Sequence, residues 1–111
     1  MIFITGPLFS GKKQAAMELL GCTEAELSAR AVWDVQDLVH GVADLEALAE
    51  ELSAHEVVIA TEVGGGVVPM DPDQRADREA AGRLAILLAR RAERVIRVYC
   101  GIPTVLKEAS R

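Results

Sequence analysis

Aromatic residues are scarce in this chain. They make up 4% of its 111 residues, whereas hydrophobic residues of all kinds make up 50%. We therefore expect a core built from Val, Ile, Leu and Ala. Cysteine is scarce as well, and the two that occur, Cys22 and Cys100, do not have the spacing of a metal site. This pattern favours inert thiols in a reducing compartment, and a disulfide is the alternative.

Long apolar runs and an excess of basic residues are also missing. No run approaches the roughly 20 residues that a membrane-spanning helix needs. The apolar opening breaks at Gly6-Pro7, too early for the core of a signal peptide. Acidic residues outnumber basic ones, 17 to 12, and the net charge is -5, which argues against a nucleic-acid partner. We expect a cytoplasmic protein of one domain, residues 1–111, with no membrane span.

The stretch Gly6–Lys13 matches the pattern G-x-x-x-x-G-K-[ST] of a phosphate-binding loop, except that Lys13 stands where Ser or Thr is required. Glycine lets the backbone wrap around a phosphate with its N–H groups turned inward. The helix expected after the loop adds free N–H groups and the positive end of its dipole. Lys12 would reach the β- and γ-phosphates. The alternative is an ordinary turn between a strand and a helix.

Apolar patterning predicts strands that alternate with helices. The expected strands are Met1–Thr5, Ala31–Val35, Val57–Ala60 and Val95–Tyr99, and the expected helices are Lys12–Leu20, a short one from the capping box at Thr23 to Arg30, one after Asp44 that carries Leu45, Leu48, Ala49 and Leu52, and Asp77–Glu93. We expect Gly101–Pro103 to end the last strand and the remaining residues to form a tail. This alternation predicts a three-layer α/β fold with a mostly parallel sheet.

Ligands of such sheets bind beyond the carboxyl ends of the strands. This rule brings the loop Gly6–Lys13, Asp34 and the glycine-rich stretch Glu62–Pro69 to one edge. Asp34 could order Mg²⁺ through water or serve as a capping or surface carboxylate, and Glu62 could contact a ligand or support its loop. The predicted ligand-binding residues are Gly6, Ser10, Gly11, Lys12, Lys13, Glu62, Gly64 and Gly66, and Asp34 is the candidate metal-site acid.

Three segments together resemble one protein family. Glu62–Pro69 is similar to its N-E-V-G-x-G-x-V-P segment, Ala81-Gly82-Arg83 to its A-G-R step, and Ala92–Pro103 to its A-D-E-V-x-L-V-x-x-G-I-P strand. Lys107 resembles the terminal L-K of that family, and the opening resembles its V-T-G-G-x-x-S-G-K-S. The family is the bifunctional adenosylcobinamide kinase / adenosylcobinamide-phosphate guanylyltransferase of cobalamin biosynthesis.

The resemblance implies a nucleotide-binding domain of the RecA-like P-loop NTPase type, truncated in this chain. It implies GTP or ATP as the nucleotide and a corrinoid as the second substrate, whose hydroxyl is phosphorylated and then receives GMP through a guanylylated histidine. It also implies a homo-oligomer, with substrate sites near the subunit contacts.

This chain departs from the family at several positions. Lys13 replaces the Mg²⁺-binding Ser, Pro7 removes a backbone N–H from the loop, and Thr61 replaces an Asn. The long segment that carries the guanylylated histidine is missing, and neither His40 nor His55 aligns with it. We therefore expect nucleotide binding in cobalamin biosynthesis with guanylyl transfer lost. The alternative is a non-catalytic paralogue that acts as a phosphate- or corrinoid-binding or scaffold subunit.

Lys13 leads to a separate hypothesis about Mg²⁺. An ammonium donates hydrogen bonds but accepts none, so it cannot ligate the ion. It could instead bring a positive charge near the place the metal would fill, which gives an anion site that does not need Mg²⁺. The alternative is that Lys13 points into solvent and the loop binds nothing.

Overall fold

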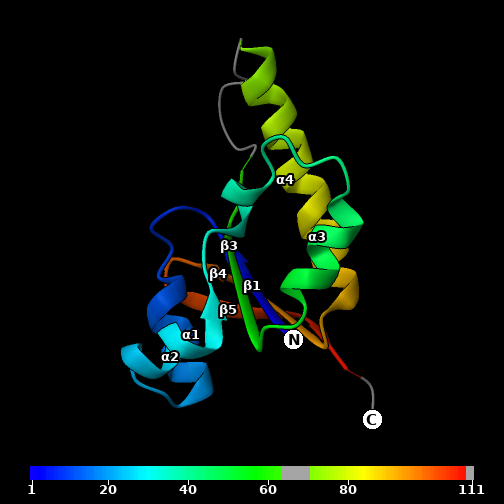
Figure 1. Ribbon diagram of the computed structural model, residues 1–111. Coiled ribbons are helices and arrows are strands. Elements are labelled where there is room, and N and C mark those ends of the chain that lie inside the picture. Colours follow the sequence, from blue (N-terminus) through cyan, green and yellow to red (C-terminus); the bar gives the residue numbers. More distant parts are fainter. Residues whose placement is uncertain (64–70, 110–111) are drawn as a thin grey trace.

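A computed structural model describes residues 1–63 and 71–109. Ten elements follow one another along the chain (Figure 1). They are β1 (Ile2–Gly6), α1 (Lys12–Leu20), α2 (Glu24–Arg30), β2 (Ala31–Val32), the 3-10 helix η1 (Val35–Leu38), α3 (Leu45–Leu52), β3 (Val57–Thr61), α4 (Pro72–Arg91), β4 (Arg94–Tyr99) and β5 (Ile102–Glu108).

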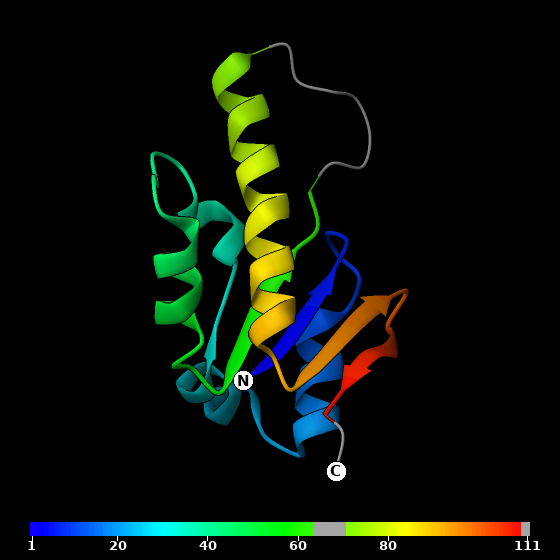
Figure 2. The same ribbon diagram turned by 90° about the vertical axis from the view of Figure 1, so that its right-hand side faces the viewer.

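The five strands form one sheet in the order β2-β3-β1-β4-β5. β1 pairs in parallel with both β3 and β4, and only β5 runs antiparallel to its neighbour, β4. The predicted α/β fold with a mostly parallel sheet is confirmed. The phosphate-loop stretch follows β1, which places it at the carboxyl edge in the middle of the sheet (Figure 2).

Helices cover both faces of the sheet, which confirms the three layers (Figure 1). Alternate residues of each inner strand point to opposite faces. Phe3 packs in the cluster formed with α3 and α4, and its neighbour Ile4 packs in the cluster formed with α1 and α2. β3 shows why continuous apolar runs predict such strands, because Val57, Val58 and Ile59 are all fully buried.

Polar caps set several helix ends as the sequence predicts. The side chain of Thr23 accepts from the backbone of Glu26, whose own side chain accepts from Thr23, so α2 begins with the expected capping box. Asp44 caps α3. The predicted start of the long helix at Asp77 is wrong: α4 begins at Pro72, after the cap Asp71, because proline fits the first helical turn.

The predicted strand Ala31–Val35 is also mostly wrong. Only Ala31–Val32 pairs with β3, and Asp34 adopts the left-handed conformation with φ 53°. A left-handed residue cannot continue a strand, so the chain turns into η1 and buries Val35 against the face of α3 and α4. The apolar Val35, which the prediction assigned to the strand, is instead a core residue of the turn that follows it.

The predicted C-terminal tail is wrong as well. Cys100 and Gly101 both have positive φ, and they reverse the chain so that β5 pairs along the whole of β4. Every residue of β5 is exposed, so the helices do not cover this strand. In Figure 2 β5 forms the edge of the sheet. Its Lys107 reaches the end of α4, where Nζ donates to the carbonyl oxygens of Ala89 at 3.0 Å and Arg90 at 3.1 Å. Within the described ranges, 1–63 and 71–109, no helix is long and apolar enough to cross a membrane.

Candidate phosphate-binding site

The loop between β1 and α1 passes very close to the neighbouring strand. A Cβ atom on Gly6 would lie 2.2 Å from the carbonyl oxygen of Val98 in β4, so only glycine fits there. Gly11 caps α1 with φ 86°, a conformation that side chains rarely adopt. These glycines are therefore needed for the path of the loop, as the motif predicts.

Lys12 lies over this loop rather than in solvent. The residue is 9% exposed, and its Nζ donates to the carbonyl oxygens of Gly6 at 3.3 Å and Pro7 at 2.8 Å. Burial lowers the pKa of Lys12, and the nearby carboxylates of Asp34 and Glu62 oppose that shift. The ammonium group of Lys12, to which the motif assigns phosphate binding, thus lies against the loop.

Ser10 adds a polar group that the described residues do not satisfy. It is 5% exposed, and its buried Oγ has no hydrogen-bond partner in the part of the chain that the structure describes. Ser10 and Lys12 line a cavity of about 250 Å³. Leu8, Phe9 and Trp33 form its apolar wall, and Phe9 is 95% exposed. A buried hydroxyl is usually paired, so a ligand atom in this cavity would complete the site.

The candidate metal-site acid, Asp34, lines the same cavity. Gln36 connects it to β3, because the Gln36 Nε2 donates to Asp34 Oδ1 at 3.4 Å while its Oε1 accepts from the backbone N–H of Thr61 at 2.9 Å. Sequence reasoning missed Gln36. No motif pointed to it, because Gln36 directly follows the stretch Ala31–Val35 that the apolar pattern assigned to a strand.

Glu62 forms a two-pronged ion pair at this edge of the sheet. Its two carboxylate oxygens accept from Arg97 of β4, from Nε at 2.7 Å and from Nη2 at 2.9 Å. This pairing raises the pKa of Arg97. Sequence reasoning also missed Arg97, although a charged residue within the apolar strand Arg94–Tyr99 was a signal that could have found it.

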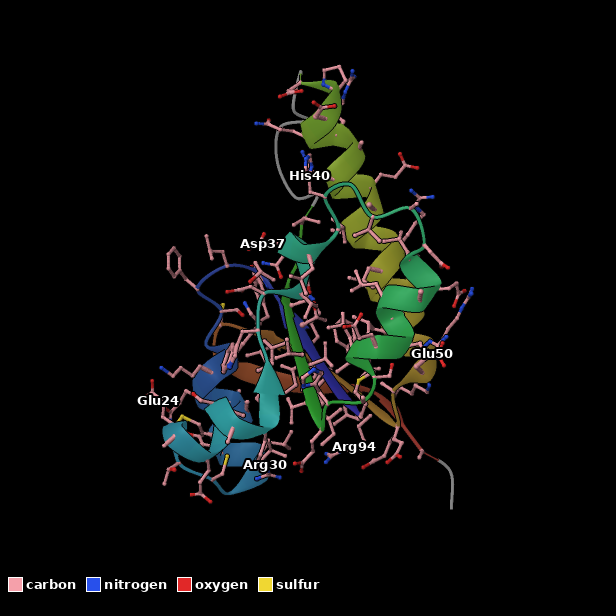
Figure 3. All side chains as sticks on the ribbon, viewed as in Figure 1. Glu24, Arg30, Asp37, His40, Glu50 and Arg94 are labelled. Atoms are coloured by element: carbon pink, nitrogen blue, oxygen red, sulfur yellow. The ribbon has the colours of Figure 1, made fainter. Side chains whose placement is uncertain are left out.

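The structure places the other predicted residues less closely. Lys13 of α1 forms an ion pair with Glu24 of α2, and both side chains are largely exposed. Gly64 and Gly66 lie outside the described residues. His55 lies before β3, at the opposite edge of the sheet from the loop. His40 contacts Asp77 of α4 at 2.9 Å and is largely exposed (Figure 3).

A protein-held Mg²⁺ fits this set of residues poorly. Mg²⁺ takes oxygen ligands in a strict octahedral arrangement, and Lys13 offers no acceptor. Both oxygens of Glu62 already accept from Arg97. Within residues 1–63 and 71–109, no group of three or more His, Cys, Asp or Glu side chains could hold a metal ion.

Comparison with models of known protein families gives a match for this chain. A family model described as cobinamide kinase / cobinamide phosphate guanyltransferase matches residues 22–106. A search of curated proteins found no match. The matched range covers most of the chain and includes Asp34, Glu62 and Arg97, whereas Gly6–Lys13 and α1 precede it.

Proposed function

The chain belongs to the cobinamide kinase / cobinamide phosphate guanyltransferase family, and we propose that it binds GTP, ATP or another phosphate-bearing ligand in the loop Gly6–Lys13. Family membership supports a nucleotide-binding role in cobalamin biosynthesis. The single observation that carries the proposal for the loop is the pair of buried groups there, the Lys12 ammonium and the unsatisfied Ser10 hydroxyl. Both are groups that hydrogen-bond phosphate oxygens.

The position of the loop gives independent support. It joins the carboxyl end of a central parallel strand to the first turn of α1. Helix N-termini favour anions because their N–H groups are unpaired and their dipole is positive there. The cavity beside the loop has polar and apolar walls, which suits a phosphate joined to a larger organic group such as a nucleoside or a corrinoid.

We further propose that guanylyl transfer is lost. That step needs a histidine nucleophile within reach of the bound nucleotide. His55 lies at the far edge of the sheet, and the His40 imidazole is paired with Asp77. A covalent GMP adduct, detected by mass spectrometry after incubation with GTP, would contradict this part of the proposal.

The second candidate is a non-catalytic phosphate- or corrinoid-binding or scaffold subunit. The ion pairs of Lys13 with Glu24 and of Glu62 with Arg97 favour it, because they engage side chains that catalysis would need for metal or substrate. Phosphoryl transfer depends on neutralising charge around the γ-phosphate, usually with metal ions.

Calorimetric titration separates these functions. GTP, ATP and a corrinoid are titrated in turn, each with and without Mg²⁺, into the parent protein and into Lys12→Met. We expect a nucleotide to bind the parent in the micromolar to millimolar range and Lys12→Met to weaken it at least about tenfold, because one charge-assisted contact is worth about 1.5–3 kcal/mol. Binding that Lys12→Met leaves unchanged would place the ligand elsewhere, and no nucleotide binding at millimolar concentration would leave only the scaffold role.

Lys13→Ser belongs in the same series. If the ammonium of Lys13 replaces the metal, the parent binds equally well with and without Mg²⁺ and the serine variant becomes dependent on Mg²⁺. For this to happen, the side chain of Lys13 would first have to break its ion pair with Glu24 of α2. Equal behaviour of the two proteins would show that Lys13 has no part in the site.

A homo-oligomer is also part of the proposal. The apolar side chains of Tyr99, Ile102, Val105 and Leu106 are all at least half exposed on β4 and β5, and a second copy that covers them would bury apolar surface. We expect light scattering at high micromolar concentration to give a mass above that of the monomer. Ile102→Lys should lower this mass, and a monomer mass for the parent would exclude self-association.

A further inference from the structure

Arg97 and Glu62 reach toward each other across the end of β1. Thr5 pairs with Arg97 of β4 on one side and with Ala60 of β3 on the other. The ion pair therefore spans the strand that leads directly into the phosphate loop. The Arg97 guanidinium also lies over the Tyr99 ring, 5.4 Å from its centroid, so contacts on two sides fix its position.

The balance of charge around Lys12 depends on this arginine. Asp34 and Glu62 are the carboxylates that act on the Lys12 ammonium, which gives two negative charges to one positive. Arg97 makes the four groups neutral. Lys13 does not contribute, because it is paired with Glu24. Without Arg97 this cluster would repel a phosphate and attract a cation.

We propose that Arg97 takes the place of a divalent cation beside Glu62, so that the site binds its phosphate ligand without a metal. The ion pair explains why the donor set fits Mg²⁺ poorly, since one of the two carboxylates that act on Lys12 is already neutralised by a side chain of the chain itself. That the ligand is a phosphate rests on the proposed function, whereas the exclusion of cations by Arg97 does not.

The contacts with Glu62 leave N–H donors of Arg97 that a ligand could engage. Glu62 accepts from Nε and Nη2, and a guanidinium carries further N–H donors on its other terminal nitrogen. A metal-free anion site needs such fixed donors, because no ion is present to bridge phosphate oxygens. Arg97 would therefore act as a binding residue together with Lys12.

Cation binding tests the proposal without any phosphate ligand. Mn²⁺ alone is titrated and followed by electron paramagnetic resonance, with the parent protein, Arg97→Met and the double variant Arg97→Met/Glu62→Gln. We expect Arg97→Met to bind Mn²⁺ at least about tenfold more tightly than the parent, because the freed carboxylate of Glu62 joins that of Asp34. The double variant should lose this gain.

Arg91→Met is the matched control, since Arg91 forms an exposed ion pair with Glu46 at 3.3 Å, between α3 and α4. It should leave Mn²⁺ binding unchanged, and circular dichroism should show that every variant is folded. If Arg97→Met binds Mn²⁺ no better than the parent, the proposal is overturned. The same holds if Lys13→Ser creates the cation site and Arg97→Met does not.

Pyrophosphate binding gives the second readout. We expect Arg97→Met to lose at least about tenfold in affinity without Mg²⁺ and to regain it when Mg²⁺ is added, whereas Glu62→Gln alone should bind at least as tightly as the parent without metal. Glu62→Gln keeps the arginine, so it remains informative if Arg97→Met fails to fold. If the parent binds no phosphate ligand, the proposed function fails, and the Mn²⁺ result still decides the role of Arg97.

Discussion

Two buried strands, β1 and β4, end side by side at the carboxyl edge of the sheet, and the chain leaves them in opposite ways. After β1 it forms the loop Gly6–Lys13 and enters α1, whereas after β4 it turns at Cys100 and Gly101 and returns as β5. Left-handed residues occur in both exits, with φ 86° at Gly11 and φ 74° at Gly101. A left-handed glycine thus precedes a helix that packs on the sheet in one case and an exposed strand in the other.

The two exits also contact each other. The backbone N–H of Gly101 donates to the carbonyl oxygen of Ser10 at 2.7 Å. A Cβ on Gly11 would lie 3.1 Å from the Cα of Gly101. The hairpin turn therefore supports the loop Gly6–Lys13 from the side.

The largest effect is expected where the first exit passes β4. Gly6→Ala would place a Cβ 2.2 Å from the Val98 carbonyl oxygen and 2.8 Å from Ser10 Oγ. Because the nearer atom belongs to the backbone, strands must shift, and we expect a loss of about 3 kcal/mol in the free energy of unfolding. Chemical denaturation measures it.

Gly101→Ala is the control for that substitution. Nothing lies within 4 Å of its Cβ position, so only the strain of φ 74° opposes it, and the cost should be about 1–2 kcal/mol. Equal losses for the two variants would mean that the close approach of Gly6 to β4 does not limit the loop.

The buried strands were predictable because burial on both faces requires a nearly continuous run of apolar residues. β1, β3 and β4 are apolar on both faces, and their residues meet helices on both sides. The glycines Gly6 and Gly11 follow from the path of the backbone, as the loop motif predicts. β5 has no such apolar pattern, because all of its residues are exposed to solvent.

The missed parts of the site have a different cause. Arg97 and Glu62 meet only because β1 lies between β3 and β4, and strand order is a property of the whole sheet. Asp34 was predicted at this edge, but it lines the cavity through a left-handed turn after β2, where the apolar pattern favoured a longer strand. Local patterns predict elements, whereas contacts between elements that are distant in sequence depend on how the elements assemble.

A pair of valine substitutions tests the contrast between covered and uncovered strands. Val57 of β3 is 0% exposed and Val105 of β5 is 50% exposed. Val57→Ala should cost about 2 kcal/mol, from lost burial and the cavity left behind, and Val105→Ala less than about 1 kcal/mol. Urea denaturation at low protein concentration gives both values. A cost for Val105→Ala as large as that for Val57→Ala would show that β5 is covered, for instance by a second copy of the chain.

The smallest effect is expected at a glycine outside both exits, and it has the opposite sign. Gly82 lies in the middle of α4, is exposed, and has nothing within 4 Å of its Cβ position. Glycine within a helix is less stable than alanine because the unfolded chain loses more freedom. Gly82→Ala should therefore raise the free energy of unfolding by about 0.5–1 kcal/mol, measured as a higher denaturation midpoint with an unchanged slope.

Gly82 also lines the cavity of about 150 Å³ between α4 and the sheet, beside Thr5 and Glu62. A stabilised variant that still binds nucleotide would show that this cavity is not needed for the ligand, whereas a destabilised variant would mean that Gly82 is packed more tightly than the structure indicates.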